Sequence, residues 1–189
     1  MQGLFEAYPR LARPSELNGA TAAFVAGYIS HLVMDETWIN DVYRPYFGER
    51  SALGGGLKAN IMDRALQFSL DSEKRGDKAL MGDIVGQVAR CELALEIDFI
   101  DGDTLRRWRE VVLDVVNRSP DWERFRYAAG RHLGEAAAES PELIEEYLRS
   151  LPDLVEETLR YLTPERVRTF AEEALGRSLE AVREYLECA

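Results

Sequence analysis

The hydrophobic pattern of the chain is helical over most of its length. Apolar residues recur every three or four positions, and no window alternates long enough to predict a strand. The densest apolar stretch runs from about Gly19 to Tyr43, and Asn18 in front of it is expected to cap its first turn. Because this stretch is apolar on nearly every side, it predicts a central buried helix with neighbours all round.

Apolar spacing and start signals predict the other helices. The spacing of apolar residues favours helices over about 57–74 and 77–99. Residues 101–104 are expected to form a turn with an N-cap, from which a further helix begins. A Ser or Thr followed by proline and an acid is typical of a helix start. This signal occurs at Ser119-Pro120-Asp121, Ser140-Pro141-Glu142 and Thr163-Pro164-Glu165, which open helices expected to end near residues 138, 150 and 186. Pro152 either kinks the second of these or restarts it through Leu162.

Together these elements predict an all-α fold. We expect a single multi-helix bundle of about seven to eight helices around the central helix, in one domain over residues 1–189. The chain has 189 residues, of which 46% are apolar and 30% charged, the balance of an ordinary globular domain with a sizeable core.

Charge and cysteine content narrow the class of function. The chain holds 34 Asp and Glu against 23 Lys and Arg, and a formal net charge of -11 should repel nucleic acid and anionic lipid. We therefore expect no nucleic-acid partner. Cys91 and Cys188 do not resemble a disulfide framework, and we interpret both as reduced thiols of a cytoplasmic protein. The N-terminus is unlike a signal peptide, and the apolar run over 22–34 is too short for a transmembrane segment.

The candidate chemistry lies within the first long helix, where His31 and Asp35 are one turn apart. At about 100° per residue, both fall on a stripe with apolar residues above and below them, so we expect both to face the core. That stripe consists of Phe24, Tyr28, His31, Asp35, Trp38 and Val42. An imidazole and a carboxylate so spaced can chelate one zinc or similar divalent ion, with the remaining ligands from facing helices. The alternative is a buried His–Asp hydrogen bond that serves packing specificity.

Other candidate groups have simpler interpretations. His132 lies at the flank of an apolar stripe, and we interpret it as a partly exposed histidine rather than a ligand. Gly54-Gly55-Gly56 is interpreted as a flexible loop, because no Walker-type Gly-Lys-Ser/Thr follows it. The last helix is expected to pack on the bundle or on a second copy of the chain. Carboxylates that qualify as metal ligands by type alone are Glu36, Asp63, Glu96, Asp98, Asp101 and Asp103.

Residues 22–47, AAFVAGYISHLVMDETWINDVYRPYF, resemble the bacterial zinc-dependent phospholipase C family. The similar positions are His31-Leu-Val-Met-Asp35, Glu36, Trp38 and Tyr43-Arg44-Pro45-Tyr46-Phe47, with a weaker echo at Asn60-Ile-Met-Asp63-Arg64-Ala65-Leu66. In that family a His and an Asp on one central helix bind zinc within a multinuclear cluster of an all-α fold. The resemblance implies hydrolysis of a small phosphoester by metal-activated water, with His31 and Asp35 as zinc ligands.

The chain differs from that family in its histidines. The family's cluster uses an N-terminal residue and several further histidines, whereas this chain has two histidines in all. Of the family's zinc ligands, only the His and Asp of the central helix have counterparts in this chain, His31 and Asp35. No catalytic residue is assigned. Either the reading frame begins downstream of the true start, or the chain is a degenerate member that keeps the scaffold. Two functions follow: a phospholipase C-like metal-dependent phosphoester hydrolase scaffold, or a non-catalytic helical protein that acts by self-association or partner binding.

Overall fold

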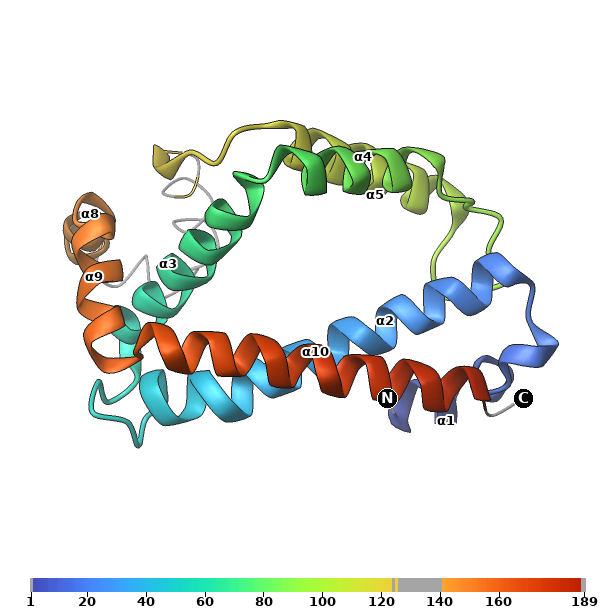
Figure 1. Ribbon diagram of the computed structural model, residues 1–189, viewed down its shortest axis with the longest axis horizontal. Coiled ribbons are helices and arrows are strands. Elements are labelled where there is room, and N and C mark those ends of the chain that lie inside the picture. Colours follow the sequence, from blue (N-terminus) through green and yellow to red (C-terminus); the bar gives the residue numbers. More distant parts are fainter. Residues whose placement is uncertain (1, 124, 126–140, 188–189) are drawn as a thin grey trace. The chain divides into compact units, whose positions relative to one another are not determined.

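The computed structural model describes residues 2–123, 125 and 141–187, and within these ranges the chain forms helices and no strand (Figure 1). This confirms the all-α class, and the described residues alone form eight α-helices, in line with the seven to eight expected. The α-helices are α1 (Gln2–Ala7), α2 (Gly19–Trp38), α3 (Gly56–Arg75), α4 (Lys78–Arg90), α5 (Gly102–Asn117), α8 (Pro141–Arg149), α9 (Leu151–Tyr161) and α10 (Pro164–Glu187). Two short 3₁₀ helices, η1 (Pro9–Ala12) and η2 (Pro14–Glu16), precede α2, and a π-helix, η3 (Ile39–Phe47), follows it.

The chain divides into two compact units. Unit 1 takes its described residues from Met1–Trp38, Met81–Arg118 and Ala171–Ala189, and unit 2 from Ile39–Leu80 and Ser119–Phe170. Each unit is considered by itself below. The single domain expected from the sequence stays a prediction.

The start of α2 is capped as the sequence predicts. Asn18 Oδ1 accepts a hydrogen bond from the Thr21 amide at 2.7 Å, and the Asn18 carbonyl accepts one from the Ala22 amide at 3.0 Å. The first bond satisfies a donor that has no partner within the helix, and the second is the first i to i−4 bond of the helix itself. The start of the last helix, α10, is also capped by a side chain, because Thr163 Oγ1 accepts a hydrogen bond from the Arg166 amide at 3.3 Å.

Helix α2 packs into unit 1 along one side. Val25 and Ile29 form a core cluster with Leu11 and Tyr185, whereas His31 is exposed. The expectation that His31 and Asp35 face the core is therefore wrong, although Phe24 of the same stripe packs against this cluster and Val42 is buried. A helix that is apolar on every side has almost no periodic signal, so the sequence does not show which side its neighbours cover. The fully buried residues of α2 are Thr21, Val25, Ile29 and Thr37.

The helix predicted over 77–99 is correct only as far as Arg90, where α4 ends. Residues 91–97 are extended, with Leu93, Leu95 and Ile97 half-buried and the residues between them exposed. The underlying sequence, Glu-Leu-Ala-Leu-Glu-Ile, alternates polar or small residues with large apolar ones. This period of two matches an extended chain lying against a core better than it matches a helix.

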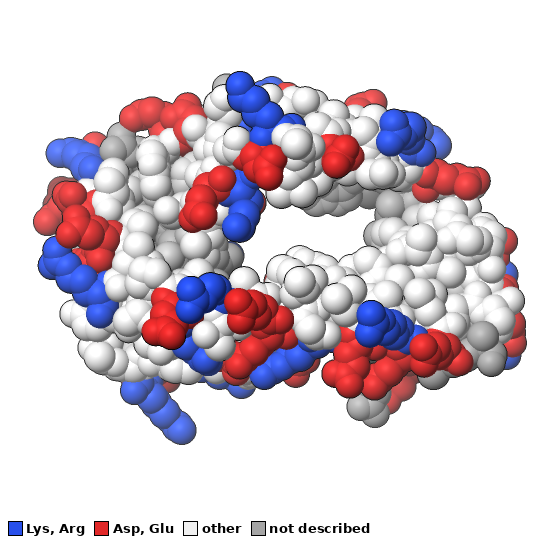
Figure 2. All heavy atoms as spheres, in the orientation of Figure 1, with Lys and Arg blue, Asp and Glu red and all other residues white. Residues whose placement is uncertain are grey.

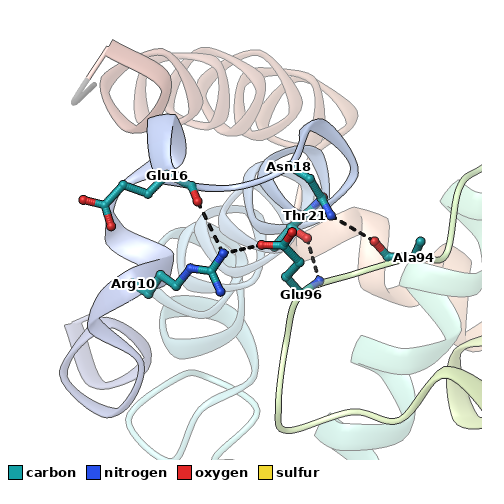
Figure 3. A network of polar contacts seen from close by, with 6 residues as sticks. All are labelled: Arg10, Glu16, Asn18, Thr21, Ala94 and Glu96. Atoms are coloured by element: carbon teal, nitrogen blue, oxygen red, sulfur yellow. Dashed lines mark hydrogen bonds and ion pairs between the residues drawn. The ribbon is translucent and has the colours of Figure 1, made fainter.

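Side chains at the start of α2 hold this extended segment in unit 1 (Figure 3). Asn18 Nδ2 donates to the Ala94 carbonyl at 3.1 Å, and Thr21 Oγ1 accepts from the Glu96 amide at 2.8 Å. The Arg10 guanidinium pairs with the Glu96 carboxylate. Side chains therefore satisfy backbone groups that have no neighbouring strand to bond.

Unit 2 has its core between α3 and α9. The Lys58 ammonium donates to Glu157 Oε1 at 2.8 Å across these helices, and this bond raises the pKa of Lys58. On the other side of α3, the Tyr43 hydroxyl of η3 donates to Asn60 Oδ1 at 2.7 Å. The buried residues of the two helices are Ala59, Ile61, Met62, Asp63, Ala65 and Leu66 of α3 with Leu151, Leu154, Val155 and Thr158 of α9.

The remaining start signals give mixed results. Asp121, not Ser119, accepts from the Glu123 amide at 2.9 Å, so that helix begins later than predicted. Pro152 lies in the first turn of α9, after a break at Ser150, so the chain restarts there instead of kinking. Ser140 and the predicted helix end near residue 138 lie outside the described residues.

Candidate metal-binding site

His31 and Asp35 lie together on α2, as their spacing predicts. His31 Nε2 is 3.3 Å from Asp35 Oδ2, and 66% and 57% of the two side chains are exposed. Both groups point to solvent, so the alternative of a buried His–Asp bond for packing specificity is wrong. An exposed pair one turn apart stabilises a helix by about 0.2–0.5 kcal/mol, and it leaves both groups accessible to an ion.

The position of α2 in unit 1 explains this exposure. Its next turn carries Thr37, which is buried and donates from Oγ1 to the Val33 carbonyl at 2.7 Å. Thr37 and Ile29 belong to the side of α2 that packs, and His31 and Asp35 lie on the other side. The core therefore fixes the helix whose outer side presents the pair.

Most of the other candidate carboxylates have separate roles. Glu96 pairs with Arg10, Asp103 pairs with Arg106, and Asp63 is buried in unit 2, where its Oδ2 accepts from Gln67 Nε2 at 2.9 Å. Among the residues that the structure describes, no group of three or more His, Cys, Asp or Glu could hold a metal ion. His132 lies outside the described residues.

Asp101 is the N-cap of α5, which supports the turn interpretation of residues 101–104. Its Oδ1 accepts from the Thr104 amide at 2.8 Å and its Oδ2 from the Thr104 hydroxyl at 2.7 Å. The hydroxyl bond and then the amide bond hold the pKa of Asp101 below its ordinary value. Both bonds stabilise the ionised carboxylate, so a helix cap accounts for this group.

The donor set on α2 fits part of a zinc site. Zinc in proteins takes four ligands, commonly imidazole nitrogen and carboxylate oxygen among them. His31 and Asp35 supply one of each from a single helix face, at a spacing that one ion can bridge after a change of side-chain rotamer. The pair therefore fits as two of four ligands, and the other two must come from elsewhere.

Helix α10 exposes an apolar surface that the sequence pattern predicted to be packed. Leu175, Leu179 and Leu186 are 57%, 48% and 48% exposed, although the sequence pattern predicts that they pack on the bundle or on a second copy. In unit 1 the buried residues of α10 are instead Ala174, Ser178 and Tyr185. The spacing of the leucines by four and seven residues, close to a heptad, was the available signal.

Charges of both signs are mixed on the described surface that Figure 2 shows, on a chain with a formal net charge of -11. In the described ranges, no helix combines the length and apolar content needed to cross a membrane.

Comparisons with known proteins add no family to this description. No family model, curated protein or solved structure matches the chain. The likeness to zinc-dependent phospholipase C therefore rests on residues 22–47 and their echo in α3.

Proposed function

We propose that the chain is a phospholipase C-like scaffold in which His31 and Asp35 bind a divalent metal ion, zinc, for the hydrolysis of a small phosphoester. The observation that supports it is the pair itself, with Nε2 and Oδ2 3.3 Å apart and both side chains open to solvent. The resemblance of residues 22–47 supplies the reaction class.

Each residue has a definite role in this proposal. His31 binds the ion through a neutral imidazole nitrogen, and Asp35 binds it as an ionised carboxylate. Bound zinc would lower the pKa of a water ligand and neutralise charge that develops on a phosphate. Because both side chains are exposed, a small phosphoester can reach them without opening the core.

Metal content tests the proposal directly. The protein is purified without added metal, exchanged into zinc-containing buffer, freed of unbound zinc and measured by inductively coupled plasma mass spectrometry. We expect bound zinc in the wild type and its loss in His31→Ala and Asp35→Ala. The matched control is Glu36→Ala, which removes an exposed neighbouring carboxylate outside the pair and should retain zinc. Zinc retained in His31→Ala, or none in the wild type, contradicts the proposal.

A phosphodiesterase assay is the second measurement. Turnover of bis(p-nitrophenyl) phosphate by the zinc-loaded wild type, lost in His31→Ala and kept in Glu36→Ala, would support hydrolysis. Bound zinc without turnover would contradict the hydrolase part and leave metal binding in place.

The alternative function, self-association, has its own observation. The exposed leucines of α10, at 48–57% exposure, form a larger apolar stripe than isolated surface leucines do. A stripe with near-heptad spacing is typical of a helix that pairs with another helix. Sedimentation velocity over a range of protein concentrations tests this, and a monomer at all of them would contradict it.

A further inference from the structure

Helix α5 of unit 1 exposes an apolar stripe beside the side that packs. Leu105 is the buried residue of this helix, whereas Trp108, Val111 and Val115 are exposed. At about 100° per residue, these three lie within about 60° of one another, so they form one stripe, which we call the α5 face. Among the large apolar side chains that the structure describes, that of Trp108 is the most exposed, at 59%. Tryptophan is enriched at the centres of protein interfaces, so the α5 face is typical of a surface that another protein covers.

Charged side chains border the outer edge of the α5 face. Along the helix they follow in the order acid, base, acid, base, and they are Asp103, Arg107, Asp114 and Arg118. All four are exposed and lie within about 60° of one another. Glu110 is turned further round the helix, away from the face. This edge therefore carries no net charge, on a chain whose net charge of -11 otherwise opposes contact between its copies.

This order of charges is complementary to itself in an antiparallel pair. A two-fold axis in the plane of the contact, perpendicular to α5 and beside Val111, brings the same edge of both copies together. Arg107 then lies level with the second copy's Asp114, and Asp103 lies level with the second copy's Arg118. Each of the four charges therefore faces an opposite charge. In a parallel pair each charge would face its own equivalent instead.

The apolar residues fit the same axis. Val111 lies beside the axis and meets the second copy's Val111. Trp108 and the second copy's Val115 come within about 3 Å of the same level along the helices. The indole of each copy therefore packs on a valine of the other, and the exposed apolar area of both stripes is removed from water.

Contacts within each copy leave the edge charges available for this pairing. Both acids already pair with arginines of their own helix, but an ionised carboxylate has lone pairs for a second guanidinium. The Arg107 guanidinium donates to Thr104 Oγ1 at 3.2 Å. A neutral hydroxyl is a weaker acceptor than a carboxylate, so Arg107 gains by turning to the second copy's Asp114.

We propose that two copies of the chain pair through the α5 face, as an antiparallel dimer with two-fold symmetry. The contact is isologous, so it closes at two copies. One helix face per copy is smaller than the roughly 800 Å² per partner of a standard interface, so we expect a dissociation constant in the micromolar range. The contact uses neither His31 nor Asp35 nor the leucines of α10, so it goes beyond the proposed metal binding and does not depend on it.

A lipid surface is a poorer match for the α5 face. Helices that lie in a membrane interface are rich in Lys and Arg on their polar face, whereas the edge of the α5 face holds acids and bases in equal number. The alternation of charge along that edge has a complement in a second copy and none in a bilayer.

Sedimentation velocity of the full chain in EDTA tests the dimer without zinc. From nanomolar to high micromolar concentration, we expect the mass to change from one chain to two. Trp108→Ala should raise the dissociation constant about 10-fold or more, as truncation of a central interface residue does. Its matched control is Leu175→Ala on α10, which truncates a similarly exposed apolar side chain and should leave the constant unchanged. Circular dichroism checks that both variants keep their helices.

Charge reversal tests the antiparallel arrangement. Arg107→Glu and Asp114→Arg should each weaken the dimer about 10-fold, because two attractive contacts become repulsive. An equal mixture of the two variants should form a heterodimer as stable as the wild-type dimer, because opposite charges face each other again at both contacts. The matched control is Arg106→Glu, which reverses a charge on the opposite side of α5 and should leave the dimer in place.

Disulfide cross-linking tests the position of the axis. In a chain that carries Cys91→Ser and Cys188→Ser, Val111→Cys should give a cross-linked dimer on oxidation, because the two side chains meet across the axis at a separation that a disulfide spans. Val115→Cys is the matched control on the same face. Its two copies lie about 13 Å apart along antiparallel helices, so it should not cross-link, whereas in a parallel pair both positions would.

Several results would overturn the proposal. A single chain at every concentration, or a dimer unchanged in Trp108→Ala, contradicts the α5 face. A dimer lost in Leu175→Ala places the contact on α10 instead. Cross-linking of Val115→Cys as fast as that of Val111→Cys contradicts the two-fold axis. Monomers that bind phosphatidylcholine vesicles, with binding lost in Trp108→Ala, assign the face to lipid. None of these results bears on zinc binding, which the zinc content of His31→Ala decides.

Discussion

Tyr185 offers the sharpest test of the core of unit 1, because its hydroxyl is buried without a hydrogen-bond partner. The residue is 6% exposed, packs with Leu11, Val25 and Ile29, and stacks on Phe5 with ring centroids 6.1 Å apart. An unsatisfied buried hydroxyl costs about 1–3 kcal/mol of desolvation. Tyr185→Phe removes that cost and keeps the ring, so we expect it to stabilise the protein by about 1 kcal/mol.

Urea denaturation followed by circular dichroism measures this change. With a slope of about 1–3 kcal/mol per molar urea, a gain of about 1 kcal/mol moves the midpoint up by about 0.3–1 M. The control is Tyr161→Phe, whose exposed side chain should leave stability within about 0.5 kcal/mol. A midpoint that falls in Tyr185→Phe would refute the reasoning, because it would mean that the hydroxyl makes a stabilising bond.

The same substitution has a pH dependence with a definite sign. Burial raises the pKa of Tyr185, so the folded state keeps its proton at a pH where the unfolded tyrosine, with a pKa of about 10, ionises. The folded state is then stabilised fully below that pH and less as the pH rises through it. The advantage of Tyr185→Phe over the wild type should therefore grow above about pH 10.

Three further predictions concern polar contacts. Asn18→Ala should cost about 1–2 kcal/mol in urea denaturation, because it removes the α2 cap and the bond to the extended segment, whereas an unchanged midpoint would argue against the cap. A double-mutant cycle of Lys58→Met and Glu157→Gln should give a coupling of only about 0.5 kcal/mol, since the side chains are 39% and 33% exposed. The lowered pKa of Asp101 means that its stabilising cap is present above about pH 4 and is lost at lower pH. Amide exchange at Thr104 should therefore accelerate at acid pH relative to the trend in Asp101→Asn, and parallel profiles would exclude the cap.

Local signals in the sequence correctly predicted the helix starts at Asn18 and Thr163. The bond from the Thr21 amide to Asn18 and the bond from the Arg166 amide to Thr163 each lie within four residues of the chain, so residue type nearly determines them. The i,i+4 distance between His31 and Asp35 is equally local.

Long-range packing was harder to predict. The exposed side of α2 depends on where Leu11 and Tyr185 pack, and both are far from His31 in sequence. The extended segment over 91–97 was predicted as helix because its apolar residues also satisfy a helical spacing. Its actual form depends on Asn18 and Thr21, which bond its backbone from far along the chain. The alternation over residues 92–97 is a local signal for this form, but the residues that bond the segment cannot be identified from it.

The central claim is that His31 and Asp35 bind zinc, and isothermal titration calorimetry of zinc into the metal-free chain tests it most directly. We expect saturable heat in the wild type and in Glu36→Ala, and no saturable heat in His31→Ala or Asp35→Ala. Equal binding by the wild type and His31→Ala would contradict the claim.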